Sequence, residues 1–142
     1  MLISDVMRNK GDLVVTVAPT ETVRSLIALL DEHRIGALVV STDKTTIAGI
    51  VSERDVVRRL HRDGAAVLDQ QVSDIMTSDV RTCTPEDDLE QVAGVMTEAR
   101  VRHLPVVRDG RLVAIVSIGD VVKNRIDELQ VERDQLVDYI HR

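Results

Sequence analysis

The stretch Gly49-Ile50-Val51-Ser52-Glu53-Arg54-Asp55-Val56-Val57 recurs later as Ala114-Ile115-Val116-Ser117-Ile118-Gly119-Asp120-Val121-Val122. Each copy passes from an apolar strand pattern into Ser-x-x-Asp, a sequence that favours the start of a helix. Two further blocks recur in the same order, and this ordered recurrence indicates an internal duplication. The blocks are residues 4–7 with 73–76 and residues 14–19 with 80–85.

Each copy predicts elements in the order β-α-β-β-α. In the first copy, a β-branched run at 14–17 predicts a strand. Val23, Leu26, Ile27 and Leu30 then recur at the spacing of one buried helix face. Two strands and a closing helix follow in both copies. The strands are expected at 37–40, 47–51, 104–107 and 112–116.

Local signals place further features in the second copy. Thr84 is expected to cap a helix with Pro85 at its first position, where a missing N–H costs nothing. Asp109-Gly110 predicts a tight turn between two strands. Cys83 falls in a predicted strand, and we interpret it as a small core residue.

Together these elements predict an α/β (α+β) fold of two repeats with pseudo-twofold symmetry and a long C-terminal helix. One repeat alone would bury too little surface to fold, so the two repeats are expected to share a core and to form two equivalent clefts. The expected boundaries are 3–62 for the first repeat, 63–71 for a polar linker, 72–126 for the second repeat and 127–142 for a helical extension.

The composition is that of a globular protein, with 44% hydrophobic and 30% charged residues. A net charge of −6 argues against a nucleic-acid partner. The single cysteine cannot form an internal disulfide, and the four histidines lack metal-ligand spacing, so no metal site is expected. No apolar run is long enough for a bilayer and no signal-peptide pattern occurs, which predicts a cytoplasmic protein without a membrane partner.

The repeated blocks resemble the CBS-domain family, in particular its stand-alone single pairs, also called Bateman modules. The resemblance covers roughly residues 3 to 126 and depends on Ser-x-x-Asp after a strand, combined with the run Arg-His-Leu-Pro-Val-Val at 102–107. It implies a flat pair of repeats, often dimerised into a disc. It also implies binding of an adenosine-containing ligand (AMP, ADP, ATP or NAD(H)), with no required cofactor, no catalysis and control of another protein.

The first cleft is expected to hold the ligand more strongly. An ionised Asp55 can accept hydrogen bonds from two ribose hydroxyls, and Arg54 offers a permanent charge to phosphate beside a helix N-terminus. The alternative is that Ser-x-x-Asp only caps the helix. The resemblance adds contacts from the second repeat and from the segment 73–80. The complete expected set is Ser52, Arg54, Asp55, Ser73, Met76, Val80, Val101, Arg102, His103 and Pro105.

The second cleft is expected to be weaker, empty or limited to a nucleoside-like ligand. It keeps the carboxylate of Asp120, but Gly119 stands where the first copy has Arg54. The resemblance implies that this cleft combines Ile35, Gly36, Ala37, Ser117, Gly119 and Asp120.

The C-terminal segment carries an apolar stripe at heptad-like spacing. Val122, Ile126, Leu129, Leu136 and Ile140 form the stripe, and Arg133 interrupts it. A homodimer contact is the favoured interpretation, and packing of the stripe on its own domain is the alternative. For the whole chain, we expect an energy or metabolite sensor that modulates a partner protein. The alternatives are a ligand-independent dimerisation or interaction adaptor with vestigial clefts, and a nucleotide-acting enzyme.

Overall fold

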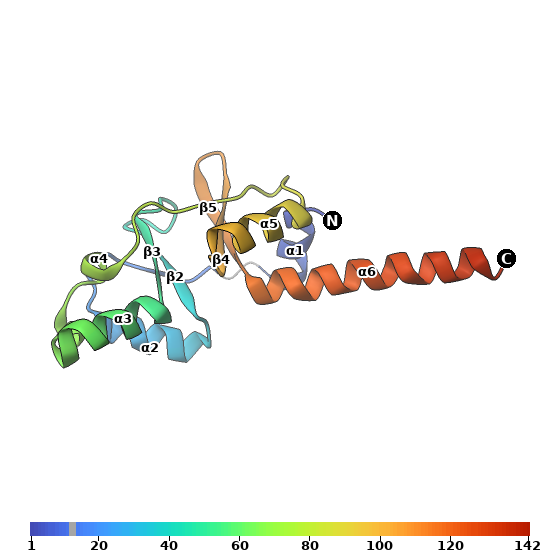
Figure 1. Ribbon diagram of the computed structural model, residues 1–142. Helices are drawn as coiled ribbons and strands as arrows, with labels where there is room; N and C mark the ends of the chain where they lie inside the picture. Colours follow the sequence, from blue (N-terminus) through green and yellow to red (C-terminus); the bar gives the residue numbers. More distant parts are fainter. Residues whose placement is uncertain (12–13) are drawn as a thin grey trace. The chain divides into compact units, whose positions relative to one another are not determined.

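The computed structural model describes residues 1–11 and 14–142. It is a mixed α and β structure in which the first copy has the predicted element order and the second copy has the same order without its first strand, as Figure 1 shows. The elements are α1 (Ile3–Lys10), β1 (Thr16–Val17), α2 (Val23–His33), β2 (Ala37–Val40), β3 (Gly49–Ser52), α3 (Glu53–Asp63), the short 3₁₀ helix η1 (Gly64–Asp69), α4 (Val72–Ile75), α5 (Leu89–Ala99), β4 (His103–Arg108), β5 (Arg111–Ser117) and α6 (Ile118–Ile140).

The chain divides into two compact units that are not continuous in sequence. Unit 1 comprises Met1–Asp12, Thr82–Val107 and Ala114–Arg142. Unit 2 comprises Leu13–Arg81 and Arg108–Val113.

Unit 2 is built on a three-stranded sheet ordered β1-β2-β3. β1 pairs in parallel with β2, where Thr16 lies opposite Val39, and β2 pairs antiparallel with β3, where Leu38 lies opposite Val51. All four residues of β2 are buried, which explains why this central strand is apolar on both faces. The strand expected at 37–40 is confirmed, the strand expected at 47–51 is present but spans 49–52, and the first strand is shorter than the expected 14–17.

Helix α2 covers this sheet with the predicted apolar face, apart from one residue. Its N-cap is Thr22, whose side chain accepts a hydrogen bond from the N–H of Ser25 (3.1 Å). Val23, Leu26 and Leu30 are buried. The prediction was wrong for Ile27, which is 36% exposed because it lines an open pocket instead of the core.

The hairpin β4–β5 confirms the predicted tight turn. Asp109 and Gly110 connect the strands with φ values of 53° and 77°, the left-handed conformation that a two-residue hairpin turn requires. Cys83 extends the hairpin as an isolated bridge, since its N–H donates to Pro105 O (3.0 Å) and its carbonyl accepts from Val107 N–H (2.8 Å). The second copy therefore replaces strand β1 by a single bridged residue.

Helix α5 begins later than the sequence predicted. The N–H of Thr84 donates to Asp87 Oδ2 (2.8 Å), and the N–H of Asp87 donates to Thr84 O (3.1 Å), which closes a turn. Asp88 then caps the helix by accepting from the N–H of Glu90 (3.0 Å). The predicted start at Thr84 and Pro85 was wrong, because aspartates satisfy these N–H groups before the helix begins.

The segment that leads each copy packs with the other copy. α1 joins α5 in unit 1, because Ile3 N–H donates to Asp87 O (2.9 Å). α4 leads the second copy but joins unit 2, because Val72 N–H donates to Glu21 O (2.8 Å). The segment 63–71 between the copies contains η1, and its Val67 is fully buried in the core of unit 2.

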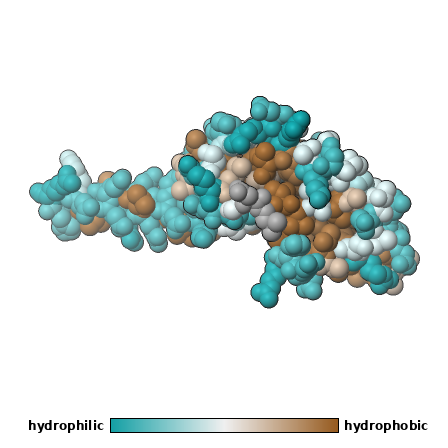
Figure 2. Space-filling model, turned by 180° about the vertical axis from the view of Figure 1, so that it is seen from behind, coloured by the Kyte–Doolittle hydropathy of each residue, from teal (hydrophilic) through white to brown (hydrophobic). Residues whose placement is uncertain are grey.

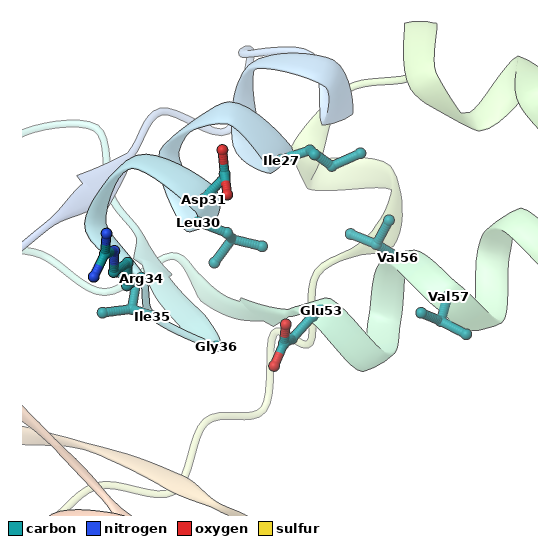
Figure 3. A pocket seen from close by; sticks show the side chains of 9 residues that line it. All are labelled: Ile27, Leu30, Asp31, Arg34, Ile35, Gly36, Glu53, Val56 and Val57. Carbon is teal, nitrogen blue, oxygen red and sulfur yellow. The ribbon is translucent and has the colours of Figure 1, made fainter.

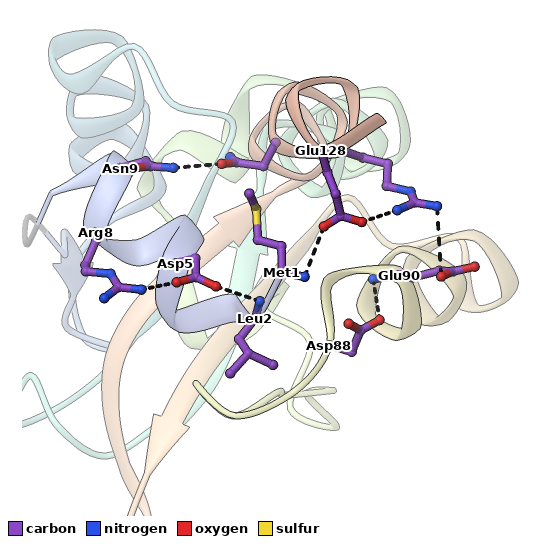
Figure 4. A network of polar contacts seen from close by, with 10 residues as sticks. Met1, Leu2, Asp5, Arg8, Asn9, Asp88, Glu90 and Glu128 are labelled. Atoms are coloured by element: carbon purple, nitrogen blue, oxygen red, sulfur yellow. Dashed lines mark hydrogen bonds and ion pairs between the residues drawn. The ribbon is translucent and has the colours of Figure 1, made fainter. Parts of the chain in front are cut away.

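Helix α6 confirms the expected long C-terminal helix, with 23 residues. Its first part is fixed within unit 1 by the polar network of Figure 4. Glu128 lies 3.0 Å from the backbone nitrogen of Met1 and pairs with Arg125, while Asn9 Nδ2 donates to Asn124 Oδ1 (3.0 Å). Among the described residues, no helix combines the length and apolarity needed to cross a membrane.

Candidate ligand-binding site

The first Ser-x-x-Asp sequence forms a capping box at the start of α3. Ser52 N–H donates to Asp55 Oδ2 (2.8 Å), and Asp55 N–H donates to Ser52 Oγ (3.3 Å). The Ser52 hydroxyl also donates to Asp55 Oδ2 (3.1 Å). Among the described residues, nothing donates to the other carboxylate oxygen, Asp55 Oδ1, and the side chain is half-buried. This oxygen is therefore available to a ligand while the box stays closed.

The second copy builds the same box at the start of α6. Ser117 N–H donates to Asp120 Oδ2 (2.9 Å), and Asp120 N–H donates to Ser117 Oγ (3.1 Å). Both copies thus show the capping arrangement that the sequence left open as an alternative. Capping uses one carboxylate oxygen in each box, so it does not prevent a second role for the aspartate.

Among the described residues, only the second box contacts a lysine, Lys10, which the sequence analysis did not predict as a site residue. Lys10 Nζ, at the end of α1, lies 2.7 Å from Asp120 Oδ2 and 2.7 Å from Ile115 O. Burial by itself raises the pKa of Asp120, but the hydrogen bonds from Lys10 and Ser117, together with the lysine charge, leave that pKa below its usual value. The carboxylate of Asp120 in the second box is therefore ion-paired with Lys10.

Repeat alignment explains why Lys10 was missed. Its equivalent in the second copy is Asp79, which is exposed, so the duplication gave no hint of a cation at this position. The only available signal was that Lys10 follows the repeated block at 4–7 by three residues. Its contact with Asp120 depends on the exchange of leading segments between the copies.

Each box also lies beside the start of a strand in its own unit. In unit 2, Glu53 N–H donates to Gly36 O (3.0 Å), and Ala37 lies opposite Ser52 in the sheet. In unit 1, Ile118 N–H donates to Arg102 O (2.8 Å). The structure therefore brings Arg102 to the box of Ser117 and Asp120 and brings Gly36 to the box of Ser52 and Asp55.

The sequence analysis combined these residues across the two halves, and that combination stays a prediction. Of the first-cleft set, Ser52, Arg54, Asp55, Ser73, Met76 and Val80 belong to unit 2, and Val101, Arg102, His103 and Pro105 belong to unit 1. Of the second-cleft set, Ile35, Gly36 and Ala37 belong to unit 2, and Ser117, Gly119 and Asp120 belong to unit 1.

Within the predicted sets, the exposed cations are the most accessible members. Arg54 and Arg102 are exposed, and neither side chain makes an ion pair among the described residues. His103 is half-buried, whereas Ala37 and Pro105 are buried, so these two residues contribute mainly to packing. In the described part of the chain, no three His, Cys, Asp or Glu side chains are grouped to hold a metal ion.

The segment after α4 approaches β3 very closely. Ile50 and Thr77 exchange two backbone hydrogen bonds of 2.9 Å. A Cβ atom on Gly49 would lie 2.7 Å from Met76 Sδ and 2.8 Å from Thr77 O. The second copy has Ala114 at the position of Gly49, and there α1 stays helical as far as Lys10. The absence of a side chain at Gly49 thus lets the segment after α4 pack closely against β3.

A pocket of about 510 Å³ opens on unit 2 between α2 and the start of α3, as Figure 3 shows. Ile27, Leu30, Ile35, Val56 and Val57 give it apolar walls. Polar side chains also line it, and these are Asp31, Arg34 and Glu53. Neither Ser52 nor Asp55 lines the pocket, but Glu53 does, so the pocket adjoins the start of α3. Ile35 and Gly36, which were predicted for the second cleft, also line it.

Comparison with known proteins agrees with this architecture. The CBS domain model matches residues 3–62 and 72–127. A CBS-domain containing protein from Agrobacterium tumefaciens is 42% identical with a TM-score of 0.85, and the match covers 88% of this chain and 99% of that one. A mitochondrial CBS domain-containing protein from Arabidopsis thaliana is 36% identical over 146 residues, or 97% of this chain and 71% of the relative.

A third similar protein was solved with a nucleotide. It is a CBS domain protein from Pyrobaculum aerophilum complexed with AMP, which is 27% identical, with a TM-score of 0.75 and coverage of 84% of this chain and 89% of that one. Two family matches cover most of the chain, and they coincide with the two copies that build the capping boxes. The chain therefore belongs to the CBS-domain family, as a tandem pair of its repeats.

Proposed function

We propose that this chain is a regulatory module that binds an adenine nucleotide (AMP, ADP, ATP or NAD(H)), modulates a partner protein and catalyses no reaction. The observation that carries the proposal is the duplicated box, in which a half-buried aspartate sits at a helix N-terminus beside a strand start. The AMP complex of the Pyrobaculum relative supports the ligand class. We place the module in the cytoplasm and expect it to act as a homodimer.

In the first cleft, Asp55 is proposed to hold the ribose. Its Oδ2 remains in the capping box while Oδ1 accepts from a sugar hydroxyl, so binding costs the helix none of its cap. Arg54 stands next to Asp55, exposed and at the positive end of α3, which suits a phosphate. Arg102 and His103 complete the proposed set from the other repeat.

In the second cleft, a ligand meets an aspartate that already has a partner. Lys10 pairs with Asp120 Oδ2, so a sugar hydroxyl would meet a carboxylate whose charge is already compensated. This compensation supports weaker binding than in the first cleft. Lys10 nevertheless supplies a positive charge in the copy where Gly119 stands in place of Arg54.

Calorimetric titration with AMP, ADP, ATP, NAD(H) and S-adenosylmethionine tests the proposal. Asp55→Asn is expected to weaken binding by about tenfold to a hundredfold, because a hydrogen bond to a charged group contributes about 1.5–3 kcal/mol. Asp88→Asn makes the same chemical change at the cap of α5 and is expected to leave affinity unchanged. Wild-type protein that binds none of these compounds would exclude the proposed ligand class.

The second candidate function is a ligand-independent interaction adaptor. The apolar pocket of unit 2 favours it, because Ile27 and Val57 remain exposed at that pocket. Capture of a partner that is insensitive to Asp55→Asn but abolished by Val57→Asp would establish the adaptor function instead. Dependence of capture on nucleotide would support the proposed sensor.

A further inference from the structure

The end of α1 is fixed beside the start of α6 within unit 1. Asn9 Nδ2 donates to Asn124 Oδ1 (3.0 Å), a contact that Figure 4 includes, and Asn124 Nδ2 donates in turn to Asp120 O (2.8 Å). Asn124 is only 5% exposed, so water competes little for these hydrogen bonds. They place Lys10, the residue after Asn9, next to the second box.

The rest of α6 has no such contacts. Every residue from 129 to 142 is exposed, and Figure 2 shows this part of the helix as a largely hydrophilic arm. The apolar stripe of α6 therefore does not pack on unit 1 in this part of the helix. The part of α6 that unit 1 holds in place is the part that carries the second box.

Lys10 has two acceptors at the second box and a third donor without an acceptor. Its Nζ lies 2.7 Å from Asp120 Oδ2 and 2.7 Å from Ile115 O. An ammonium group carries three N–H donors. No other acceptor among the described residues is hydrogen-bonded to Lys10 Nζ, and the side chain is 32% exposed. One donor of Lys10 is therefore available to a ligand at the box.

The contact with Ile115 O holds Lys10 at the box independently of Asp120. In the first copy, Ile50 has the position of Ile115, and its carbonyl accepts from the N–H of Thr77 (2.9 Å). Lys10 thus replaces a neutral backbone donor by a charged side-chain donor. Because Ile115 O retains the lysine, a hydroxyl that binds Asp120 does not have to expel it from the box.

We infer that Lys10 makes the second box selective for a phosphorylated adenosine ligand over the unphosphorylated nucleoside. This inference rests on the proposed function, which places a ribose at the aspartate of the box. It departs from the sequence expectation of a nucleoside-like ligand, which depended on Gly119 in place of Arg54. The leading segment of the chain supplies the cation that the box sequence lacks.

The selectivity follows from what each ligand offers to Lys10. The ribose of a neutral nucleoside shares Asp120 with the lysine and offers no charge in return. A nucleotide adds a phosphate oxygen, which accepts from the third donor of the ammonium group in a charge-assisted hydrogen bond. The first box has no equivalent, because the residue at the position of Lys10 is the exposed Asp79.

Calorimetric titration with AMP and with adenosine in an Asp55→Asn background, where the first box is weakened, tests the inference. Binding that the further change Asp120→Asn removes is assigned to the second box. Lys10→Met is expected to lower the ratio of AMP affinity to adenosine affinity at this box by about tenfold to a hundredfold, the range for a hydrogen bond between charged groups. Adenosine affinity is expected not to fall.

Arg8→Met is the matched control, because it removes one positive charge from the same helix at a residue that pairs with Asp5. The ratio is expected to stay unchanged in this variant, and circular dichroism checks that every variant is folded. A ratio that falls in Lys10→Met but not in Arg8→Met supports the inference.

Four results overturn it. An unchanged ratio in Lys10→Met shows that the lysine does not contact the phosphate, and equal losses of AMP and adenosine affinity show that it only maintains the box. Absence of binding in Asp55→Asn, while the wild type binds AMP, shows that the second box takes no ligand. A wild type that binds neither compound overturns the proposed function as well, so the two failures are distinguishable.

Discussion

Lys10 Nζ and Asp120 Oδ2 lie 2.7 Å apart, although 110 positions separate these residues in the chain. The pair joins the end of α1 to the start of α6 and gives the second box a counterion that its own sequence lacks. Asp55 has no equivalent lysine, because Asp79 stands at that position. The two boxes share the same capping hydrogen bonds, and among the described residues only the second contains an ion pair with a lysine.

Lys10→Met is expected to raise the pKa of Asp120. Burial of this carboxylate remains in the variant, whereas the hydrogen bond and charge that lower its pKa are lost. Carboxyl NMR titration measures the shift, and Arg8→Met on the same helix, which removes the pair with Asp5, serves as control. An Asp120 pKa that stays below the ordinary value in Lys10→Met would show that Ser117 alone lowers it.

The same variant predicts a change in how stability depends on pH. A carboxylate with a lowered folded pKa stabilises the fold above its unfolded pKa of about 3.9, and this contribution is lost as the pH falls through the folded pKa. Wild type and Lys10→Met are therefore expected to differ most in unfolding free energy near neutral pH and to converge under acid. Urea unfolding at a series of pH values measures the difference, and a gap that widens under acid would contradict the assignment.

Gly49→Ala is expected to destabilise the fold by about 1–3 kcal/mol, the usual cost of overpacking. The added methyl group would collide with Met76 and with the backbone oxygen of Thr77, which is held by its pairing with Ile50. Gly94→Ala is the matched control, because nothing lies within 4 Å of its Cβ position on α5. Helix propensity predicts that this control gains up to about 1 kcal/mol. Equal denaturation midpoints for Gly49→Ala and Gly94→Ala would contradict the close contact of Gly49 with Met76 and Thr77.

Cys83 is expected to resist alkylation in the folded protein. Burial, with a smaller contribution from the charge of Asp87, raises the pKa of its thiol to about 12, so almost no thiolate exists at neutral pH. Its buried position also confirms the interpretation of Cys83 as a small core residue. Mass spectrometry after iodoacetamide treatment provides the measurement, with an exposed thiol from Val131→Cys as the reference. Modification of both thiols at the same rate would contradict the burial of the Cys83 thiol.

Several features were predictable because they depend on neighbouring residues. The hairpin turn at Asp109 and Gly110 needs only two residues that tolerate positive φ, and both copies of Ser-x-x-Asp form their boxes within a single helical turn. The start of α5 was mispredicted because Thr84, Asp87 and Asp88 are all residue types that can cap a helix, and the folded chain uses Asp88. Local propensity does not decide among such candidates.

The sequence by itself determined the duplication, the order of elements in each copy and the aspartate at the start of α3 and α6, because periodicity and capping act over a few residues. Tertiary structure alone decided that each leading segment joins the other copy. It also decided that Lys10 meets Asp120 and that Gly49 admits Met76. These contacts join segments that are distant in the chain, and only the packing of the folded chain brings such segments within hydrogen-bonding distance.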